Sequence, residues 1–454
     1  LSSSSAASDV YKRQGGRVRL LREGEEGFNR YLSGVKGRVA QDGLRLEREV
    51  RSILNGVRQR GDEALVHYTE LFDGVRIPVQ KLRVKRGEVE EAYRKVPQEF
   101  LRTLKKAAHR IRRFHRSVTK RLSTPYVPQT TRLEKGIRLG QMIRPIERLG
   151  IYVPGGKASY PSTVLMAAIP AKVAGVQKIL MTTPPQKEGI NPAILVAADL
   201  AGVDQIYRVG GAQAIAALAY GTASIPKVDK IVGPGNRYVA TAKRLVYGAV
   251  DIDMVAGPSE IVIVADEETP PSYVASDLIS QAEHDEMALA ILITTSEVFG
   301  EEVRKELKRQ LSSLKRERIA SASLKRRGAI LIVKDLDQAI ELANQIAPEH
   351  LELSNSDAPS LAKGVKNAGA IFLGPYTPEA IGDYLAGPNH ILPTGGTARF
   401  TSPLGVEDFI KRTNLMSFTQ SALRRFEKDV KRFAEWEGLE GHYQSVQVRM
   451  KRSQ

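Results

Sequence analysis

The sequence predicts an α/β fold built on parallel sheets, because short apolar runs alternate with segments of helical period from Leu149 onward. Several of these runs end in turns that contain glycine or proline, as strands do before a crossover helix. The alternation occurs over residues 150–258 and again over residues 259–396, which predicts two related domains. Mainly helical segments come before and after these domains.

The composition is that of an ordinary globular protein, because 454 residues with 42% hydrophobic content can bury sizeable cores. There is no apolar run of about eighteen residues and no secretory leader, so we expect a cytoplasmic protein without a membrane span. Cysteine is absent, which excludes disulfides, thiolate metal ligands and cysteine nucleophiles.

A net charge of +17 and a pI near 9.8 are typical of proteins that bind nucleic acid. The densest basic run, residues 102–121, also carries Leu104, Ile111 and Val118 at helical spacing. One face of this helix is therefore core, and the basic face is solvated. Because no nucleic-acid motif accompanies the charge, we expect no nucleic-acid partner.

Residues 18–147 read as mainly helical. We expect a separate helical segment at 15–40, and we expect residues 41–149 to pack with residues 259–396 as one discontinuous α/β domain. Residues 1–14 lack an initiator methionine and any apolar period, so we interpret them as a non-native leader.

The first α/β half, residues 150–258, has clear signals for its element ends. Asn191 is an expected helix N-cap, Pro192 suits the first helical position, and Gly202 suits the helix end. The expected strands cover residues 150–153, 178–182, 205–209 and 230–232, and the expected helices cover residues 161–176, 191–201 and 212–220.

Three turns of this half, at residues 152–156, 210–213 and 233–236, follow predicted strands and are rich in glycine. Glycine lets backbone amides approach an anion, and each turn leads into a helix N-terminus. Ligands of open α/β sheets lie at the carboxyl ends of strands, so a nucleotide could lie across these turns. The alternative is that tight turns simply need glycine, since no G-x-G-x-x-G motif is present.

The second half repeats the pattern and is followed by a helical tail at 397–454. The expected strands cover residues 260–265, 289–294, 329–333, 350–353 and 370–373, and the expected helices cover residues 303–314, 336–346 and 359–368. The tail helix, expected through residues 417–436, carries an apolar stripe from Phe418 to Phe433 that needs a surface to cover. From the sequence alone, the alternative that the tail folds back on its own subunit is open.

Polar residues gather in the second half and the tail. Gln281 and His284 lie three apart at a predicted helix end, so both side chains can face one point. With Asp383 and His442 they form a set of nitrogen and oxygen donors that suits a catalytic metal site. From the helix end alone, the alternative of a solvated histidine is open.

These motifs resemble those of the histidinol dehydrogenase family from about Val18 to Val448. The motifs that carry the resemblance are Gly150-Ile-Tyr-Val-Pro-Gly-Gly156, Val209-Gly-Gly-Ala-Gln-Ala-Ile-Ala216, the block at 228–265, Ser-Gln-Ala-Glu-His284, Pro-Glu-His350-Leu-Glu, and Gly-Asp383 through His390-Ile-Leu-Pro-Thr. The resemblance implies two related, incomplete Rossmann-like domains. It also implies oxidation of L-histidinol to L-histidine, through the aldehyde, with two NAD and one zinc ion per subunit.

The resemblance also implies roles for single residues, and an intertwined homodimer whose tail reaches the partner's site. Glu349 and His350 are implied as the acid–base pair. The implied zinc ligands are Gln281, His284, Asp383 and His442; the implied NAD contacts are Tyr152, Gln213 and Asn236; and the implied substrate contacts are Ser259, Gln281, His284, His350, Asp383, His390, Glu437 and His442.

The residue chemistry supports this interpretation independently. Hydride removal from an alcohol needs a base for the hydroxyl proton, and His350 suits that role. Without cysteine the aldehyde cannot be oxidised through a thioester, so it must be hydrated, with Glu349 as the base for water. Two other classes stay open: a zinc hydrolase would bind no NAD, and a nucleic-acid-binding protein would show steep salt dependence.

Overall fold

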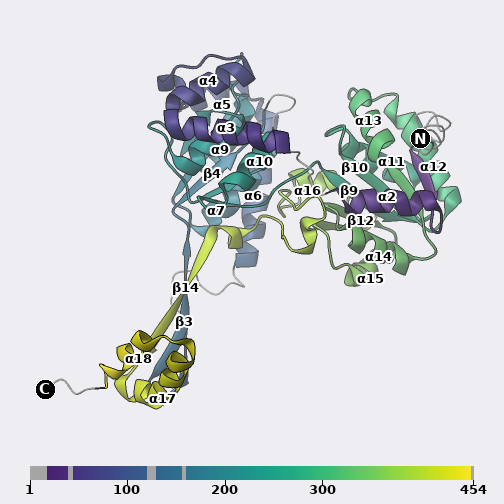
Figure 1. The fold of residues 1–454 in the computed structure, drawn as a ribbon. Helices are drawn as coiled ribbons and strands as arrows, with labels where there is room; N and C mark the ends of the chain where they lie inside the picture. The colour runs from purple at the N-terminus through teal and green to yellow at the C-terminus, as the bar shows by residue number, and fades with distance from the viewer. Residues whose placement is uncertain (1–17, 39–43, 120–128, 156–159, 451–454) are drawn as a thin grey trace, which may run out of the picture. The chain divides into compact units, whose positions relative to one another are not determined.

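The computed structural model describes residues 18–38, 44–119, 129–155 and 160–450 (Figure 1). The proposed leader at 1–14 and the second glycine of the 152–156 turn, Gly156, lie outside the described residues. A larger compact unit consists of the chain up to Arg116 together with Glu147–Asp408, and a smaller unit consists of Ser117–Ile146 and Phe409–Gln454. Within the described part of the chain, no helix is both long and apolar enough to cross a membrane.

The first parallel sheet has the strand order β6-β5-β4-β7-β8. When the strands of this sheet are numbered in chain order, their order across the sheet is 3-2-1-4-5. This is the order of a Rossmann fold that lacks its sixth strand. The four predicted strands are confirmed, and β8 is an additional short strand at the edge. The strands are β4 (Arg148–Tyr152), β5 (Lys178–Thr183), β6 (Gln205–Arg208), β7 (Lys230–Val232) and β8 (Asp251–Ile252).

The helices of this half are α7 (Pro161–Ala174), α8 (Pro192–Ala201), α9 (Gly211–Tyr220) and α10 (Arg237–Val246). The predicted ends of α8 are confirmed. The Asn191 side chain accepts a hydrogen bond from the Ala193 amide at 2.8 Å, and Gly202 adopts a left-handed conformation with φ 83°.

The second parallel sheet repeats this topology, with the order β1-β11-β10-β9-β12-β13. Without β1 its strands again lie in the order 3-2-1-4-5 along the chain, so the prediction of two related halves is confirmed. Every residue of β9 and β10 is buried, as in strands covered on both faces. The strands are β1 (Arg19–Arg22), β9 (Glu260–Ala265), β10 (Leu289–Thr294), β11 (Ala329–Ile332), β12 (His350–Ser354) and β13 (Ala370–Leu373).

The helices of the second half are α11 (Pro271–Ala282), α12 (Glu297–Leu311), α13 (Glu317–Arg327), α14 (Leu336–Ile346), α15 (Ala358–Leu361) and α16 (Glu379–Tyr384). The predicted helix at 359–368 is wrong in extent: α15 has four residues and passes into a 3-10 turn, Ala362–Gly364. Glycine disfavours helix continuation at that point. The charged helix α13 is not among the predicted helices.

The N-terminal helices pack differently from the prediction. They are α2 (Glu26–Lys36), α3 (Leu44–Arg60), α4 (Asp62–Asp73), α5 (Arg86–Lys95) and α6 (Gln98–Thr119). Leu46, Val50 and Ile53 of α3 share one core with Ile215 and Leu218 of α9, in the first half. β1 and α2 instead join the second half. The expected pairing of residues 41–149 with residues 259–396 is therefore wrong for α3, because its apolar stripe fits the alanine-rich face of α9.

The smaller unit corrects the expectation that residues 18–147 and the tail at 397–454 are mainly helical. It contains an antiparallel sheet of order β14-β3-β2, in which β3 (Ile137–Pro145) pairs with β14 (Ile410–Phe418) along nine residues (Figure 1). β2 (Gln129–Glu134), α17 (Gln420–Glu437) and α18 (Glu440–Gln447) complete the described part of this unit. β14 is mostly exposed, and β3 is mostly half-buried without a strict alternation, so local periodicity does not reveal these two strands.

Candidate active site

The amino ends of the central strands in the second sheet carry the predicted acid–base residues. Glu260 is the first residue of β9, and His350 is the first residue of the neighbouring strand β12, where it lies opposite Ile261. Glu349 directly precedes β12. The three side chains are buried, with at most 7% of any of these residues exposed.

His350 is held in one tautomer by the backbone of Glu260. Its Nδ1 atom lies 3.0 Å from the Glu260 carbonyl oxygen. Because a carbonyl oxygen only accepts, Nδ1 carries the proton and Nε2 keeps a free lone pair. Burial lowers the pKa of His350, so the imidazole stays neutral. A neutral ring with a free Nε2 can accept a proton.

Glu349 is bonded to the same residue. Its Oε2 atom accepts a hydrogen bond from the Glu260 amide at 2.8 Å, and it lies 3.7 Å from Nδ1 of His350, too far for a hydrogen bond between the two side chains. Burial raises the pKa of Glu349 well above its ordinary value, and the Glu260 hydrogen bond opposes that shift. One backbone unit thus orients both predicted acid–base groups.

The Glu260 carboxylate has a separate, structural partner that the sequence analysis missed. It forms a buried ion pair with Arg38, in which Nη2 lies 2.8 Å from Oε2. The Gly395 amide donates to its Oε1 atom at 3.1 Å. Because the pair joins residues 222 positions apart, no local pattern reveals it. It anchors the strand end that orients Glu349 and His350.

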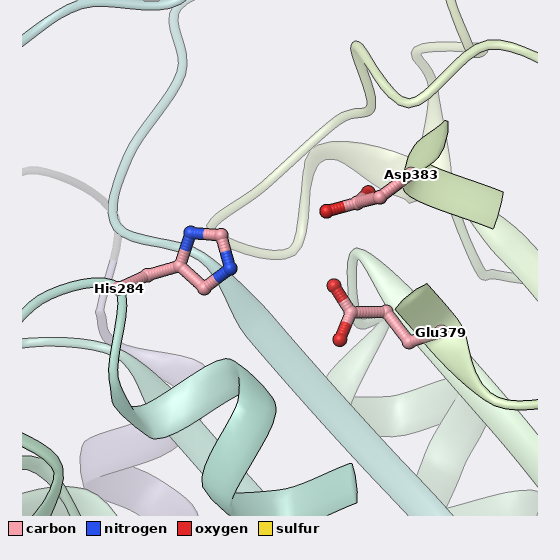
Figure 2. A group of neighbouring side chains, drawn as sticks. All are labelled: His284, Glu379 and Asp383. Carbon is pink, nitrogen blue, oxygen red and sulfur yellow. The ribbon is translucent and has the colours of Figure 1, made fainter. Parts of the chain in front are cut away.

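A group of potential metal ligands lies at the end of α11. His284, Glu379 and Asp383 each offer a ligand atom, and these atoms lie within 4.8 Å of one another. Figure 2 shows the imidazole, which comes from the loop after α11, facing two carboxylates that come from α16. Two of the four predicted ligands, His284 and Asp383, are therefore brought together. Glu379 was missed, although it lies one helical turn before Asp383 and shares its helix face.

Gln281, a third predicted ligand, lies in the last turn of α11 and is fully buried. In one orientation its amide nitrogen donates to Oε1 of Glu379 at 3.2 Å, and its oxygen accepts from the Glu260 amide at 3.3 Å. Glu379 also accepts from the Ser280 hydroxyl at 2.9 Å. Glu379 therefore fixes the orientation of Gln281 beside the ligand group.

These donors fit a divalent metal. Burial, together with the charge of Asp383, raises the pKa of Glu379 to about 8, although His284 opposes the shift. A bound cation would compensate this buried negative charge. One imidazole, two carboxylates and an amide oxygen are ligands that zinc accepts in catalytic sites.

His442, the fourth predicted ligand, is an exposed residue of α18, and Glu437 is the exposed last residue of α17. Both belong to the smaller unit, whereas His284 and Asp383 belong to the larger one. Their participation in the metal and substrate site stays a prediction.

The other predicted substrate contacts lie in the larger unit. The Nδ1 atom of His390 lies 2.9 Å from the Asp383 carbonyl oxygen, and its Nε2 atom lies 3.4 Å from the Thr163 hydroxyl. Burial lowers the pKa of His390. Ser259 directly precedes β9, and its carbonyl accepts from the Leu289 amide at 2.9 Å. A hollow of about 450 Å³ beside His284 is lined by His284, Asp285, Glu286, Arg316, Arg318 and Ile319.

The predicted cofactor residues lie in the first half, at the carboxyl ends of its parallel strands, whereas the acid–base residues lie at the amino ends of strands in the second half. Tyr152 ends β4, and its hydroxyl oxygen accepts from the Gly211 amide at 3.2 Å. Gln213 is 1% exposed, and neither amide atom has a hydrogen-bond partner among the described residues. The Asn236 side chain caps α10 by accepting from the amides of Tyr238 and Val239. β4 and β7 are the adjacent strands where the order reverses, which is where such sheets bind nucleotides.

A sheet edge suited to a dinucleotide, together with a second edge suited to proton transfer beside metal ligands, defines the protein as an α/β oxidoreductase. The family model for histidinol dehydrogenase matches residues 37–450. The chain therefore belongs to the histidinol dehydrogenase family, whose members oxidise histidinol in histidine biosynthesis.

Relatives and a solved structure agree with this assignment. A histidinol dehydrogenase of Syntrophotalea carbinolica is 52% identical over 436 residues, covering 96% of this chain and all of that protein. One from Bacillus anthracis is 56% identical over 404 residues, covering 89% of this chain and 92% of that protein. The crystal structure of histidinol dehydrogenase from Elizabethkingia anophelis has a TM-score of 0.87 and 36% identity, and the match covers 95% of this chain and 98% of that one.

Proposed function

We propose that the protein catalyses the zinc- and NAD-dependent, four-electron oxidation of L-histidinol to L-histidine through L-histidinaldehyde. The observation that carries this proposal is the pairing of His350 and Glu349 on the backbone of Glu260. His350 is a neutral base and Glu349 is a buried carboxyl. The negative charge of Asp383, in the ligand group, acts to raise the pKa of both. Two proton-transfer groups suit two successive oxidations.

In the first oxidation, Nε2 of His350 accepts the hydroxyl proton while the carbinol C–H leaves as a hydride, so a C=O bond forms. The Glu260 carbonyl keeps Nδ1 protonated throughout, which directs the incoming proton to Nε2. Proton acceptance by a positioned base contributes about 10²–10⁴ in rate.

In the second oxidation, water adds to the aldehyde carbon, with Glu349 taking the water proton. The hydrate then loses a second hydride and its remaining hydroxyl proton to give the carboxylate. The Glu260 amide orients the Glu349 carboxylate for this step. A carboxyl with a raised pKa is the stronger base once its proton has left.

Gln281, His284, Asp383 and, from the tail, His442 would hold zinc, with Glu379 fixing the Gln281 amide. Bound zinc would hold the imidazole and amine of one substrate through both oxidations, a positioning role. Ser259, His390 and Glu437 would contact the substrate. The hollow beside His284 has lining groups of both charges, which suits the zwitterionic product, L-histidine.

Tyr152, Gln213 and Asn236 would contact NAD at the carboxyl edge of the first sheet, and bound NAD would accept one hydride in each oxidation. The unpartnered amide of buried Gln213 supports a ligand at this place. We further infer a cytoplasmic homodimer with one zinc per subunit, in which the tail at 397–454 is exchanged between subunits. Exposed Phe433 and Trp436, at 71% and 92%, support a surface that another chain covers.

The test is NAD reduction with histidinol, counting the NADH formed for each substrate consumed. We expect two NADH per histidine and no free aldehyde. A ratio of one would contradict the second oxidation. Hydrolytic activity without NAD binding would favour a zinc hydrolase, and salt-sensitive DNA binding without dehydrogenase activity would favour a nucleic-acid-binding protein.

A further inference from the structure

A buried ion pair lies inside the first α/β half, away from every residue assigned above to substrate or metal. Lys243 of α10 pairs with Asp253, which follows β8, and their side chains are 2% and 1% exposed. Charged groups at this depth are uncommon unless they are paired and hydrogen-bonded. The contacts of these two buried charges therefore indicate which part of the fold they stabilise.

Both charged groups bind the backbone of one residue, Gly233. The Lys243 Nζ atom donates to the Gly233 carbonyl oxygen at 2.9 Å, and the Gly233 amide donates to Oδ2 of Asp253 at 2.8 Å. Oδ1 of Asp253 also accepts from the Met254 amide at 2.6 Å. The donor and the acceptor of Gly233 are thus both taken by a single ion pair.

Gly233 is a residue whose conformation needs such support. It directly follows β7, and its φ of 111° is one that side chains disfavour. A Cβ atom there would lie 2.1 Å from the Tyr152 carbonyl oxygen, so the turn passes directly against the end of β4. Glycine has the greatest backbone freedom, and the two charged bonds restrict it.

The turn connects this buried point to the start of α10. Gly233 is buried, whereas Asn236, the N-cap of α10, is exposed. Lys243 belongs to α10 itself and reaches back toward the N-terminus of that helix. The ion pair therefore connects the segment after β8 and helix α10 to the turn between β7 and α10, and it restricts the conformation of that turn.

We propose that Lys243 and Asp253 are positioning residues for NAD, acting through Gly233 on the turn at 233–236 and on the α10 N-terminus. This inference rests on the proposed NAD site. Both side chains are almost fully buried, so we expect them to act through the turn and not by touching the cofactor. A buried ion pair often stabilises a fold no better than apolar residues of the same size, so orientation of the turn is the effect to expect from its removal.

The test compares two double variants. Lys243→Met/Asp253→Leu removes both charges and leaves neither unpaired. Lys172→Met/Asp204→Leu removes another Lys–Asp pair of the same half, with a separation of 3.1 Å and about 30% of each side chain exposed, that does not touch Gly233. NAD dissociation constants are measured by titration calorimetry, together with steady-state kinetics and zinc content.

We expect the dissociation constant and KM for NAD to rise about 10- to 100-fold in Lys243→Met/Asp253→Leu, the range seen when groups that orient direct ligands are lost. We expect kcat at saturating NAD and the zinc content to stay within about twofold of the unaltered chain, since uniform binding is what is lost. The Lys172→Met/Asp204→Leu control should bind NAD normally.

Lys243→Met/Asp253→Asn serves if the first double variant does not fold, because it leaves no unpaired charge and the asparagine side-chain oxygen can still accept from the Gly233 amide. We expect a smaller rise in the NAD dissociation constant there. An unchanged NAD dissociation constant in either folded variant overturns the positioning role. If the unaltered chain does not bind NAD, the proposed function itself is overturned.

Discussion

The two parallel sheets share one strand order but differ at the point where that order reverses. In the first half, β4 ends at Tyr152 and β7 ends directly before Gly233, and both strands lead into turns that contain glycine. In the second half, the equivalent strands β9 and β12 end beside Asp266 and Asn355, and Glu267 and Glu268 follow Asp266. Carboxylates repel the phosphates that glycine turns attract. Repetition of a topology therefore does not repeat its binding site.

The proposed functional groups of the second half lie at the other edge of the sheet. Glu260 and His350 open β9 and β12, and His284 follows α11, whose end lies at the amino side of β10. In our proposal, side chains rather than backbone amides act there. We infer that the two halves share a scaffold with two edges, and that the loops determine which edge binds an anion and which edge transfers protons.

The largest expected effect is that catalysis depends on a metal held by the second half, whereas NAD binding by the first half does not. Chelation, or His284→Ala, should abolish turnover, because it removes a ligand of the second half, and zinc should restore activity to the chelated protein. NAD binding, measured by calorimetry, should stay unchanged. His67→Ala is the control, because His67 is exposed on α4. Full activity in protein shown by elemental analysis to be metal-free would contradict this prediction.

A second prediction distinguishes the roles of Glu349 and His350, which lie at the amino ends of strands in the second half. Glu349→Gln should slow aldehyde oxidation by about 10²–10⁴, the cost of losing a positioned base. Reduction of the aldehyde to histidinol needs no water activation and should lose less. Stopped-flow assays of the two half-reactions compare them. Equal losses in both directions would show that Glu349 and His350 do not have separate roles.

A third effect concerns the glycine turn of the first half. Gly233→Ala should weaken NAD binding by about 10²-fold, the order expected when groups move by about 1 Å. Gly248→Ala is matched, because Gly248 has a φ of 99° in the same half but no atom within 4 Å of the added Cβ. Calorimetry with NAD should also give a stoichiometry of one per chain. A second NAD per chain would remove the contrast between the two switch points.

A fourth, smaller effect tests whether the two halves of one chain form a complete active site without the tail of another chain. His284→Ala and His442→Ala are each expected to be inactive. With an exchanged tail, half of randomly mixed dimers are mixed and carry one sound site in two, so about a quarter of activity should return on mixing. If mass spectrometry shows subunit exchange and no activity returns, His442 serves its own chain.

The smallest effect is a pH dependence of stability in the helices beside the first half. Burial raises the pKa of Asp73, on α4, to about 6 from an ordinary value of 3.8. The folded state therefore binds this proton more tightly than the unfolded state. The resulting stabilisation is complete below pH 3.8 and is lost as the pH rises through about 6. Urea midpoints from pH 4 to 8 should fall less in Asp73→Asn than in the unaltered chain, and parallel curves would refute the assignment.

Much of the larger unit follows from local sequence. The strands at 230–232, 260–265 and 289–294 are predicted to the residue, because buried parallel strands are continuous apolar runs bounded by turns. The partly exposed strand at 370–373 is also predicted to the residue. Asn191, Pro192 and Gly202 bound α8 as their backbone preferences require. Residue types and spacing also predicted His284 and Asp383 as metal ligands, and the family resemblance implied Glu349 and His350 as the acid–base pair; these roles remain predictions.

The tertiary structure alone decided the partners of these segments. The pairing of β3 with β14, the packing of α3 on α9, and the Arg38–Glu260 ion pair join residues that are distant in the chain. Glu379 and the Lys243–Asp253 pair likewise show their roles only through what they contact. Periodicity records which face of a segment avoids water. Which surface covers that face depends on complementary shape and charge elsewhere in the chain, and only the folded structure brings those surfaces together.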